Sequence, residues 1–351
     1  MSTSDNCKDG LSKSNDSVCD NMNDMLQNMS VRDADDKVNV CANCGKEGDD
    51  INNICNKCNQ VKYCNAVCKK VHKKKHKKDC EEYIKIATEK HGEELRIAAE
   101  HEAKLHDEKL FKQPPPKEDC PICFQRLPTL DSGSTYNSCC GKVICNGCVH
   151  APVYDNQGNK VAQKVCPFCR VPYPNSMEKE VQRVKKRIEA NDAQAFFNMG
   201  CFYRDGVYGL PQDHTKALEL FHRAGDLGYA NAYNNIGSAY YHGRKVKVDM
   251  KKALHYYELG AMGGNEIARD NLGNIEEEIN GNIDRALKHH MIAARSGDAG
   301  SLERIKVLYG HGHATKEDYT QALRSYQEYL GEIKSPQRDE AAALSDKYRY
   351  Y

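Results

Sequence analysis

Cysteine is the residue type whose number and spacing point most directly to chemistry in this sequence. There are 18 cysteines among 351 residues, seven of them between positions 41 and 80 and eight between positions 120 and 169. The chain opens without an apolar leader of the kind that directs secretion, so we expect an intracellular protein, cytoplasmic or nuclear, with its thiols in a reducing compartment. Clustered thiols in such a compartment bind metal ions more often than they form disulfides.

The first cluster contains eight potential ligands in four short pairs. They are Cys41, Cys44, Cys55, Cys58, Cys64, Cys68, His76 and Cys80. Zinc takes four tetrahedral thiolate or imidazole ligands, and a C-x2-C, C-x3-C or H-x3-C pair can deliver two of them to one ion. The eight ligands therefore predict two zinc ions, and a set of unrelated thiols is not favoured, because every ligand has a partner at ligand spacing.

Residues 41–80 resemble a MYND-type zinc finger, with all eight ligand positions of that family filled. The resemblance implies that the pairs interleave between two sites. The first site would then contain Cys41, Cys44, Cys64 and Cys68, and the second Cys55, Cys58, His76 and Cys80. Lys69 and Lys73 stand where the family usually has Gln and Trp, so the usual capture of proline-rich peptides does not follow from the resemblance.

Eight lysines lie between Val61 and Cys80. Such a run can contact phosphates or act as a nuclear-import signal, but we favour a solvated helix face on a small finger, since Tyr63 is the one aromatic residue among the lysines. The whole chain has a formal net charge of +1, and no apolar run approaches the ~20 residues of a membrane span. We therefore expect neither nucleic acid nor a membrane as the main partner.

A second cysteine module contains eight further cysteines in four pairs. They are Cys120, Cys123, Cys139, Cys140, Cys145, Cys148, Cys166 and Cys169. Residues 119–172 resemble a RING-type zinc finger, which implies a first site of Cys120, Cys123, Cys145 and Cys148. The family's usual middle histidine is replaced by Lys142, whose ammonium cannot bind zinc. We predict that Cys139 and Cys140 complete the second site with Cys166 and Cys169, and we keep open His150 as a ligand or a degenerate module with one zinc ion.

RING modules of ubiquitin ligases have no nucleophile and act by positioning a ubiquitin-conjugating enzyme and its linked ubiquitin. Three residues match the docking surface of that family, namely Ile122, Pro167 and Arg170. An arginine suits such a contact because its planar fork offers several donors at once. The alternative is that Ile122 and Pro167 only shape the cysteine turns and that Arg170 is a solvated charge.

Self-similarity begins near residue 193, where an Ala-x4-Gly pattern recurs at Gly200, Gly237 and Gly273. Repeats of 33 to 37 residues with small residues at fixed positions indicate paired helices that stack into a solenoid, because one pair cannot bury its own apolar face. Residues 192–331 resemble Sel-1-like repeats, which are relatives of the tetratricopeptide class. The resemblance implies a scaffold that binds other proteins, and we interpret Cys201, beside a repeat glycine, as a small buried hydrophobe.

We therefore predict a multidomain, mainly α protein in which two small cross-braced zinc modules precede an α-solenoid of helix-turn-helix repeats. The expected parts are a disordered tail (1–40), a MYND-type finger (41–80), a helical linker that ends in a proline run (81–116), a RING-like finger (117–175), the solenoid (176–334) and a polar tail (335–351). We leave open whether that last tail occupies the groove of the solenoid.

Two functional hypotheses follow, and both include zinc and protein binding. In the first, the protein is a ubiquitin ligase that recruits a conjugating enzyme through the RING-like module and a substrate protein through the repeats. In the second, it is a zinc-dependent adaptor that joins protein partners and catalyses nothing. The sequence contains no Ser-His-Asp set, carboxylate pair or phosphate loop that would indicate another enzyme class.

Overall fold

The computed structural model describes residues 39–49, 51–114, 117–154, 157, 159–161 and 165–351. The tail expected over 1–40 lies outside these residues except for its last two. The chain divides into two compact units, Met1–Lys104 and Leu105–Tyr351. We describe each unit by itself.

The first unit contains the first cysteine cluster and most of one long helix. Strands β1 (Asn53–Ile54) and β2 (Lys62–Tyr63) form a short antiparallel hairpin. Ile51 and Tyr63 are buried among the cysteines and supply the small apolar core of the finger. Helix α2 (Ala66–Leu110) follows directly, so the expected linker helix is continuous with the last helix of the finger.

Helix α2 is stabilised along its exposed length by its own charges. Arg96, for example, pairs with Glu93 one turn before it (2.6 Å) and with Glu100 one turn after it, the spacing at which helical side chains are neighbours. The helix ends at Leu110, shortly before the proline run, since proline cannot continue a helical hydrogen-bond ladder. Most of α2 therefore needs no partner surface to remain helical.

The second cysteine module belongs to the second unit. It contains η1 (Asp131–Gly133), β3 (Ser134–Asn137), β4 (Lys142–Cys145), α3 (Asn146–Val149), β5 (Val153–Tyr154) and β6 (Lys160–Val161). Strands β3 and β4 pair antiparallel from Ser134↔Cys145 to Asn137↔Lys142, and β5 pairs with β6. Ile144 and Leu127 are buried among the cysteines, so the metal-ligand residues themselves form most of the core of this module.

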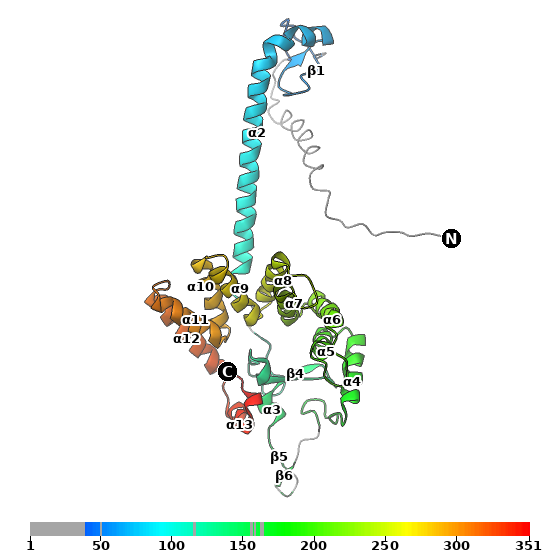
Figure 1. Ribbon diagram of the computed structural model, residues 1–351, viewed down its shortest axis with the longest axis vertical. Helices are drawn as coiled ribbons and strands as arrows, with labels where there is room; N and C mark the ends of the chain where they lie inside the picture. The colour runs from blue at the N-terminus through cyan, green and yellow to red at the C-terminus, as the bar shows by residue number, and fades with distance from the viewer. Residues whose placement is uncertain (1–38, 50, 115–116, 155–156, 158, 162–164) are drawn as a thin grey trace, which may run out of the picture. The chain divides into compact units, whose positions relative to one another are not determined.

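Antiparallel helices make up the rest of the second unit. They are α4 (Met177–Glu189), α5 (Ala193–Asp205), α6 (His214–Asp226), α7 (Ala230–His242), α8 (Met250–Met262), α9 (Glu266–Glu278), α10 (Ile283–Arg295), α11 (Ala299–Gly310), α12 (Lys316–Ile333) and α13 (Pro336–Leu344), followed by η2 (Asp346–Tyr348). Figure 1 shows α4 to α12 stacked in an arc. This arrangement confirms the predicted α-solenoid.

The sequence explains where these helices begin and how closely they pack. Asp213 and Asp249 cap α6 and α8, each accepting a hydrogen bond from the third N–H after it at 3.0 Å, as short polar side chains do at helix N-termini. The repeat glycines allow close contact between paired helices. A Cβ on Gly200 would lie 2.6 Å from the ring of Phe221. The Ala-x4-Gly pattern therefore reports helix packing.

The final turn of α2 also packs into the solenoid. Leu110 is buried in a cluster with Tyr257 and Leu272, and its carbonyl accepts a hydrogen bond from Arg269. Asp107 pairs with Arg285 of α10 at 2.6 Å. This end of the expected linker is therefore part of the solenoid core.

The second cysteine module lies inside the arc and is bonded to both ends of it (Figure 1). At the first end, the hydroxyl of Tyr136 donates to Asp192, the cap of α5, at 2.8 Å. At the other end, the N–H of Thr129 donates to the hydroxyl of Tyr329 in α12, also at 2.8 Å, and Arg126 pairs with Glu332. The module therefore connects the start of α5 with α12, near the two ends of the solenoid.

Residues 335–351, expected as a polar tail, are structured and pack on the second cysteine module. Helix α13 contacts α3, and Arg338 and Tyr350 are each 1% exposed. Figure 1 shows the segment beside α3. Polar composition suggested a tail because most of its residues are charged or small, but two large side chains, Arg338 and Tyr350, are buried against the module.

Candidate metal centres

The ligand-type residues of the two modules gather into four groups. These groups are Cys41, Cys44, Cys64 and Cys68; Cys55, Cys58, His76 and Cys80; Cys120, Cys123, Cys145 and Cys148; and Cys139, Cys140, Cys166 and Cys169. Within each group, all four ligand atoms lie within 4.8 Å of one another. The structure thus brings together the same sets that the family resemblances imply for the first three sites and that we predicted for the fourth.

The distances inside the first finger fit zinc. A tetrahedral ion with Zn–S bonds of about 2.3 Å places its sulfurs about 3.8 Å apart. The sulfur of Cys64 lies 3.7 Å from that of Cys44 and 3.5 Å from that of Cys68. In the second group, Nε2 of His76 lies 3.2 Å from the sulfur of Cys58. A disulfide would instead require about 2.05 Å.

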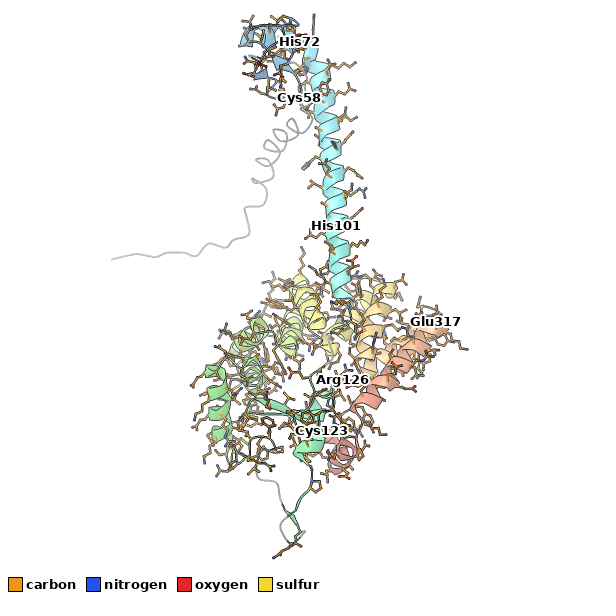
Figure 2. The ribbon with its side chains drawn as sticks, turned by 180° about the vertical axis from the view of Figure 1, so that it is seen from behind. Cys58, His72, His101, Cys123, Arg126 and Glu317 are labelled. Carbon is orange, nitrogen blue, oxygen red and sulfur yellow. The ribbon has the colours of Figure 1, made fainter. Side chains whose placement is uncertain are left out.

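Helix α2 presents its ligands by simple periodicity. His76 and Cys80 are one turn apart, so both side chains lie on the same face of the helix. His72, one turn earlier, is outside the ligand group. It contacts the hydroxyl of Tyr63 through Nδ1 at 3.3 Å and stacks on the ring of His76, and Figure 2 shows it in the finger with Cys58. His72 therefore supports the ring of a ligand and is not itself in the group.

The second cysteine module has similar spacing. The sulfurs of Cys123 and Cys145 lie 3.7 Å apart. In the group that includes the adjacent cysteines, Cys139 lies 3.3 Å from Cys169, and Cys140 lies 4.0 Å from Cys166. The tight turn between β3 and β4 places both Cys139 and Cys140 at this group.

His150 and Lys142, the two residues that complicated the sequence-based assignment, are outside these groups. The ring of His150 lies 4.0 Å from that of Tyr348 at the end of the chain. Lys142 begins β4 with an exposed side chain. All four donors of the last group are therefore thiols, a set that suits zinc.

A common backbone feature marks one C-x2-C pair in each group. The residue directly after the pair has a positive φ, 73° at Gly45, 52° at Asn59, 58° at Phe124 and 62° at Arg170. Its N–H donates to the carbonyl of the first cysteine of its pair at 2.9 Å in all four cases. Phenylalanine and arginine rarely adopt this conformation, so residue type gave no signal of these turns.

Local hydrogen bonds favour the thiolate, the form that binds metal, at some of the ligand cysteines, whereas a hydrogen bond with Cys68 raises the pKa of Cys64 to about 12 and burial raises the pKa of Cys139. The backbone N–H of Cys64, with those of Cys44 and Asn43, lowers the pKa of Cys41 to about 6. In the second module, hydrogen bonds from Cys145 and Cys148 hold the pKa of Cys120 well below its usual range. Donors directed at a sulfur stabilise its charged form.

The three residues that resemble a docking surface are not equally exposed. Ile122 and Pro167 are half-buried, and Ile122 packs on the core of the module, whereas Arg170 is exposed. Two aromatic neighbours in the same cysteine turns are also exposed, Phe124 at 78% and Phe168 at 44%. Sequence reasoning passed over both, because an aromatic residue beside a zinc ligand is usually packed.

A Ser-His-Asp cluster in the solenoid has no catalytic geometry. The hydroxyl of Ser301 donates to Asp270 at 2.6 Å, and Nδ1 of His290 faces both residues, at 3.3 Å and 3.1 Å. One nitrogen facing both groups cannot relay a proton between them. His290 and Ser301 are also completely buried, so this cluster stabilises the packing of α9, α10 and α11.

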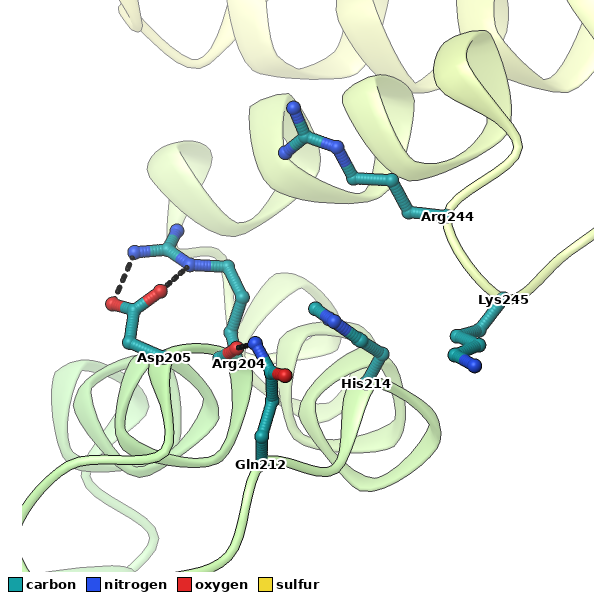
Figure 3. Close-up of a pocket in the computed structure, with 6 residues that line it drawn as sticks. All are labelled: Arg204, Asp205, Gln212, His214, Arg244 and Lys245. Atoms are coloured by element: carbon teal, nitrogen blue, oxygen red, sulfur yellow. Dashed lines mark hydrogen bonds and ion pairs between the residues drawn. The ribbon is translucent and has the colours of Figure 1, made fainter.

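A cationic pocket of about 380 Å³ lies between the loops of two successive repeats (Figure 3). Arg204, Arg244 and Lys245 contribute positive charge, and Asp205 pairs with Arg204 at 2.7 Å. In the described residues no ion pair involves Arg244 or Lys245, and Figure 3 shows both side chains without a bonded neighbour among the pocket residues. Two cations of the pocket are therefore left for an external anion.

No helix in the described part of the chain combines the length and apolar character that crossing a membrane requires.

Known proteins match this chain in two separate regions. The family model described as MYND finger matches residues 41–80. The model described as Sel1 repeat matches residues 193–229, 230–265 and 307–327. A solved Sel1 repeat protein from Oxalobacter formigenes is 28% identical, with 44% of this chain and 64% of that chain covered and a TM-score of 0.39.

The curated relatives share only a small part of their own length with this chain. The putative sel1-like repeat-containing protein L21 of Acanthamoeba polyphaga mimivirus is 24% identical over 42% of this chain and 28% of its own length. The ERAD-associated E3 ubiquitin-protein ligase component HRD3B of Arabidopsis thaliana is 31% identical over 27% of this chain and 15% of its own. This chain therefore carries a MYND finger over residues 41–80 and Sel1 repeats in its helical region.

Proposed function

We propose that this protein is an intracellular scaffold that binds four structural zinc ions and holds protein partners together. A MYND finger and Sel1 repeats indicate a protein-interaction adaptor, and the cysteine groups indicate zinc binding. The number of four ions is supported by one observation, namely that every group has the same backbone turn after one of its C-x2-C pairs. Phe124 and Arg170 have positive φ, which is an unfavourable conformation for these residue types and persists only where the surrounding structure imposes it. An ion bound by the two cysteines before each residue would impose it.

Each proposed site is closed by four protein ligands. Such zinc ions contribute folding free energy and have no open position for water. The ions would hold the finger and the second cysteine module together, and the residues around them would present surfaces to partners. Chelation should therefore abolish hydrogen-exchange protection in residues 41–80 and 117–175. Unchanged protection in both segments after complete chelation would contradict the proposal.

A partner can dock on the repeats at the cationic pocket. The inner side of the arc is taken by the second cysteine module, whereas the pocket is open and has Arg244 and Lys245 without acidic partners among the described residues. Complementary charge steers association and fixes register. An acidic segment of a partner protein is therefore the ligand we expect there.

A second candidate role is ubiquitin transfer, and the exposure of Arg170 favours it. This arginine projects from the last cysteine turn with no ion pair among the described residues, close in sequence to the exposed ring of Phe168. The relative HRD3B is by name a component of a ubiquitin ligase. The second cysteine module would recruit a conjugating enzyme through Ile122, Pro167 and Arg170, and the repeats would recruit a substrate.

The test of this role uses the zinc-loaded full chain with activating enzyme, ubiquitin and a panel of conjugating enzymes. Arg170→Gly should abolish transfer, and it suits the φ of 62° at this position, so backbone strain cannot explain the loss. Arg324→Ala, at an exposed site on α12, is the matched control and should leave transfer intact. Absence of transfer with every conjugating enzyme would refute ligase activity and leave the scaffold role.

A further inference from the structure

The contacts of Arg338 connect the C-terminal helix α13 to the metal group of Cys120, Cys123, Cys145 and Cys148. Its guanidinium donates to the carbonyls of Arg126 (2.9 Å), Gln125 (3.3 Å) and Ile333 (2.6 Å) and lies 3.9 Å from the sulfur of Cys123. Figure 2 shows Cys123 and Arg126 close together in this module. Arg338 thus reaches the first cysteine turn from a segment more than 180 residues further along the chain.

The charge of Arg338 lacks a carboxylate partner. Its side chain is 1% exposed, and no Asp or Glu in the described residues forms an ion pair with it. A buried guanidinium without a counter-charge is strongly destabilising. The group nearest to it that could carry negative charge is the sulfur of Cys123, 3.9 Å from the guanidinium.

Zinc controls that charge. An ion of charge +2 bound by four thiolates leaves a centre of net charge −2, and metal binding drives the four protons off. Such a centre would supply the negative charge that the buried guanidinium otherwise lacks.

The packing of α13 on α3 adds a second physical connection. Helix α3 begins after Cys145 and contains Cys148, two ligands of the same group. A Cβ on Gly147 would lie 2.9 Å from the backbone nitrogen of Arg338, so the two backbones touch. Any rearrangement of α3 on metal loss would remove the surface on which α13 rests.

The last residues of the chain continue this contact. The hydroxyl of Ser132 donates to the carbonyl of Arg349 at 2.7 Å, and the ring of Tyr348 lies against that of His150. Tyr350 is buried beside Gly133. The whole segment 335–351 thus covers the side of the module formed by η1 and α3.

We propose that residues 335–351 are a zinc-dependent latch in which Arg338 is the outer-sphere partner of the site formed by Cys120, Cys123, Cys145 and Cys148. Zinc binding and docking of α13 stabilise each other, as linkage requires. Because α13 directly follows α12, the docked latch ties the last repeat to the module, whose other edge is bonded to α5 through Tyr136. Zinc at this site therefore strengthens the connection between the module and the last repeat, beside the direct contact of Thr129 with Tyr329.

This inference rests on the proposed zinc sites of the second module, and the experiment separates the two. Native mass spectrometry of the full chain counts zinc ions, and competition with a chromophoric chelator ranks their affinities. Arg338→Met should bind one zinc about tenfold more weakly than the wild-type chain does, the usual minimum for loss of an outer-shell partner. Arg324→Met, on the exposed face of α12, should bind all four zinc ions as the wild type does.

Hydrogen exchange gives the reciprocal readout. Cys123→Ser should remove protection from residues 336–344 while α5 and α6 stay protected, whereas Cys55→Ser in the finger should leave 336–344 unchanged. Two zinc ions in the wild-type chain would overturn the proposed sites of the second module. Four zinc ions with unchanged affinity in Arg338→Met, or a protected α13 in Cys123→Ser, would overturn the latch alone.

Misfolding of the methionine variant would appear as lost protection in α5 and α6. Arg338→Lys then decides, because it keeps the cation but lacks the planar fork. Its zinc affinity should fall less than tenfold and its α13 should remain protected while zinc is bound. A lysine variant with full zinc affinity and an unprotected α13 would refute the latch.

Discussion

Acidification should loosen the packing of α9 and α10 through His289. This side chain of α10 is completely buried, and neither ring nitrogen has a hydrogen-bond partner in the described residues. Its ring lies 4.7 Å from that of Phe111. Burial, reinforced by the positive charges of Arg269 and Arg285 and by His290, lowers its pKa from 6.5 to about 2.

The sign and size of the effect follow from linkage. In the unfolded chain His289 binds a proton as the pH falls below about 6.5, whereas in the folded chain it stays neutral down to about pH 2. Between these values the unfolded state binds more protons than the folded state does. The free energy of unfolding therefore decreases by about 1.4 kcal/mol for each unit by which the pH is lowered. The loss from this residue is about 2 kcal/mol at pH 5.

Hydrogen exchange of peptides from α9 and α10 at pH 7.5 and pH 5 measures this loss, after correction for the intrinsic exchange rate. His289→Leu loses no hydrogen bond, and its side chain cannot be protonated. Between pH 7.5 and pH 5, the free energy of opening α9 and α10 should therefore decrease less in this variant than in the wild type, by a difference of about 2 kcal/mol. His311→Leu, at an exposed position, should follow the wild type. Equal pH dependence in the wild type and His289→Leu would refute the reasoning.

Three further predictions concern the turns, the thiols and the pocket. Gly45→Ala should destabilise the zinc-loaded finger by about 1 kcal/mol, because φ at this position is 73° with open space around it and alanine resists that conformation. The control Gly92→Ala, within α2, should instead raise helicity. Chelator titration measures the first effect and circular dichroism the second, and a finger as stable as the wild type would contradict the prediction. Cys140→Ser should lower the zinc count in native mass spectrometry, while Cys201→Ser, outside every ligand group, should not. Arg244→Glu should weaken binding of an acidic probe peptide at least tenfold in fluorescence anisotropy at low salt, with a smaller difference at high salt; equal affinity at all salt concentrations would exclude the pocket as the docking site.

Local spacing predicted much of the metal chemistry. A short pair such as Cys41 and Cys44 places both sulfurs near one point independently of the rest of the fold, so these pairs could be predicted from the sequence. Which pairs share a site depends on tertiary structure, and that part came from family resemblance. The MYND finger and the Sel1 repeats are confirmed by the family models, because ligand spacing and helix-packing glycines both leave fixed sequence patterns.

The placement of the second cysteine module could not be predicted in this way. Its bonds to the solenoid join residues far apart in sequence, such as Thr129 and Tyr329, and neither residue stands out by type. The burial of Arg338 could not be predicted either, because its partners are the carbonyls of Arg126 and Gln125, more than 200 residues earlier in the chain. Helix α2 was expected to begin near residue 81, but its lysine-rich first turns are exposed and carry no apolar periodicity to mark their start at Ala66.

The central claim is that this chain binds four zinc ions in closed, structural sites. Native mass spectrometry of the full chain, purified with zinc under reducing conditions, tests it most directly. We expect a mass increase of four zinc ions per chain, less eight or more protons, because cysteine ligands bind as thiolates. A zinc-saturated chain that carries only two ions would contradict the account, because the second cysteine module would then fold without metal.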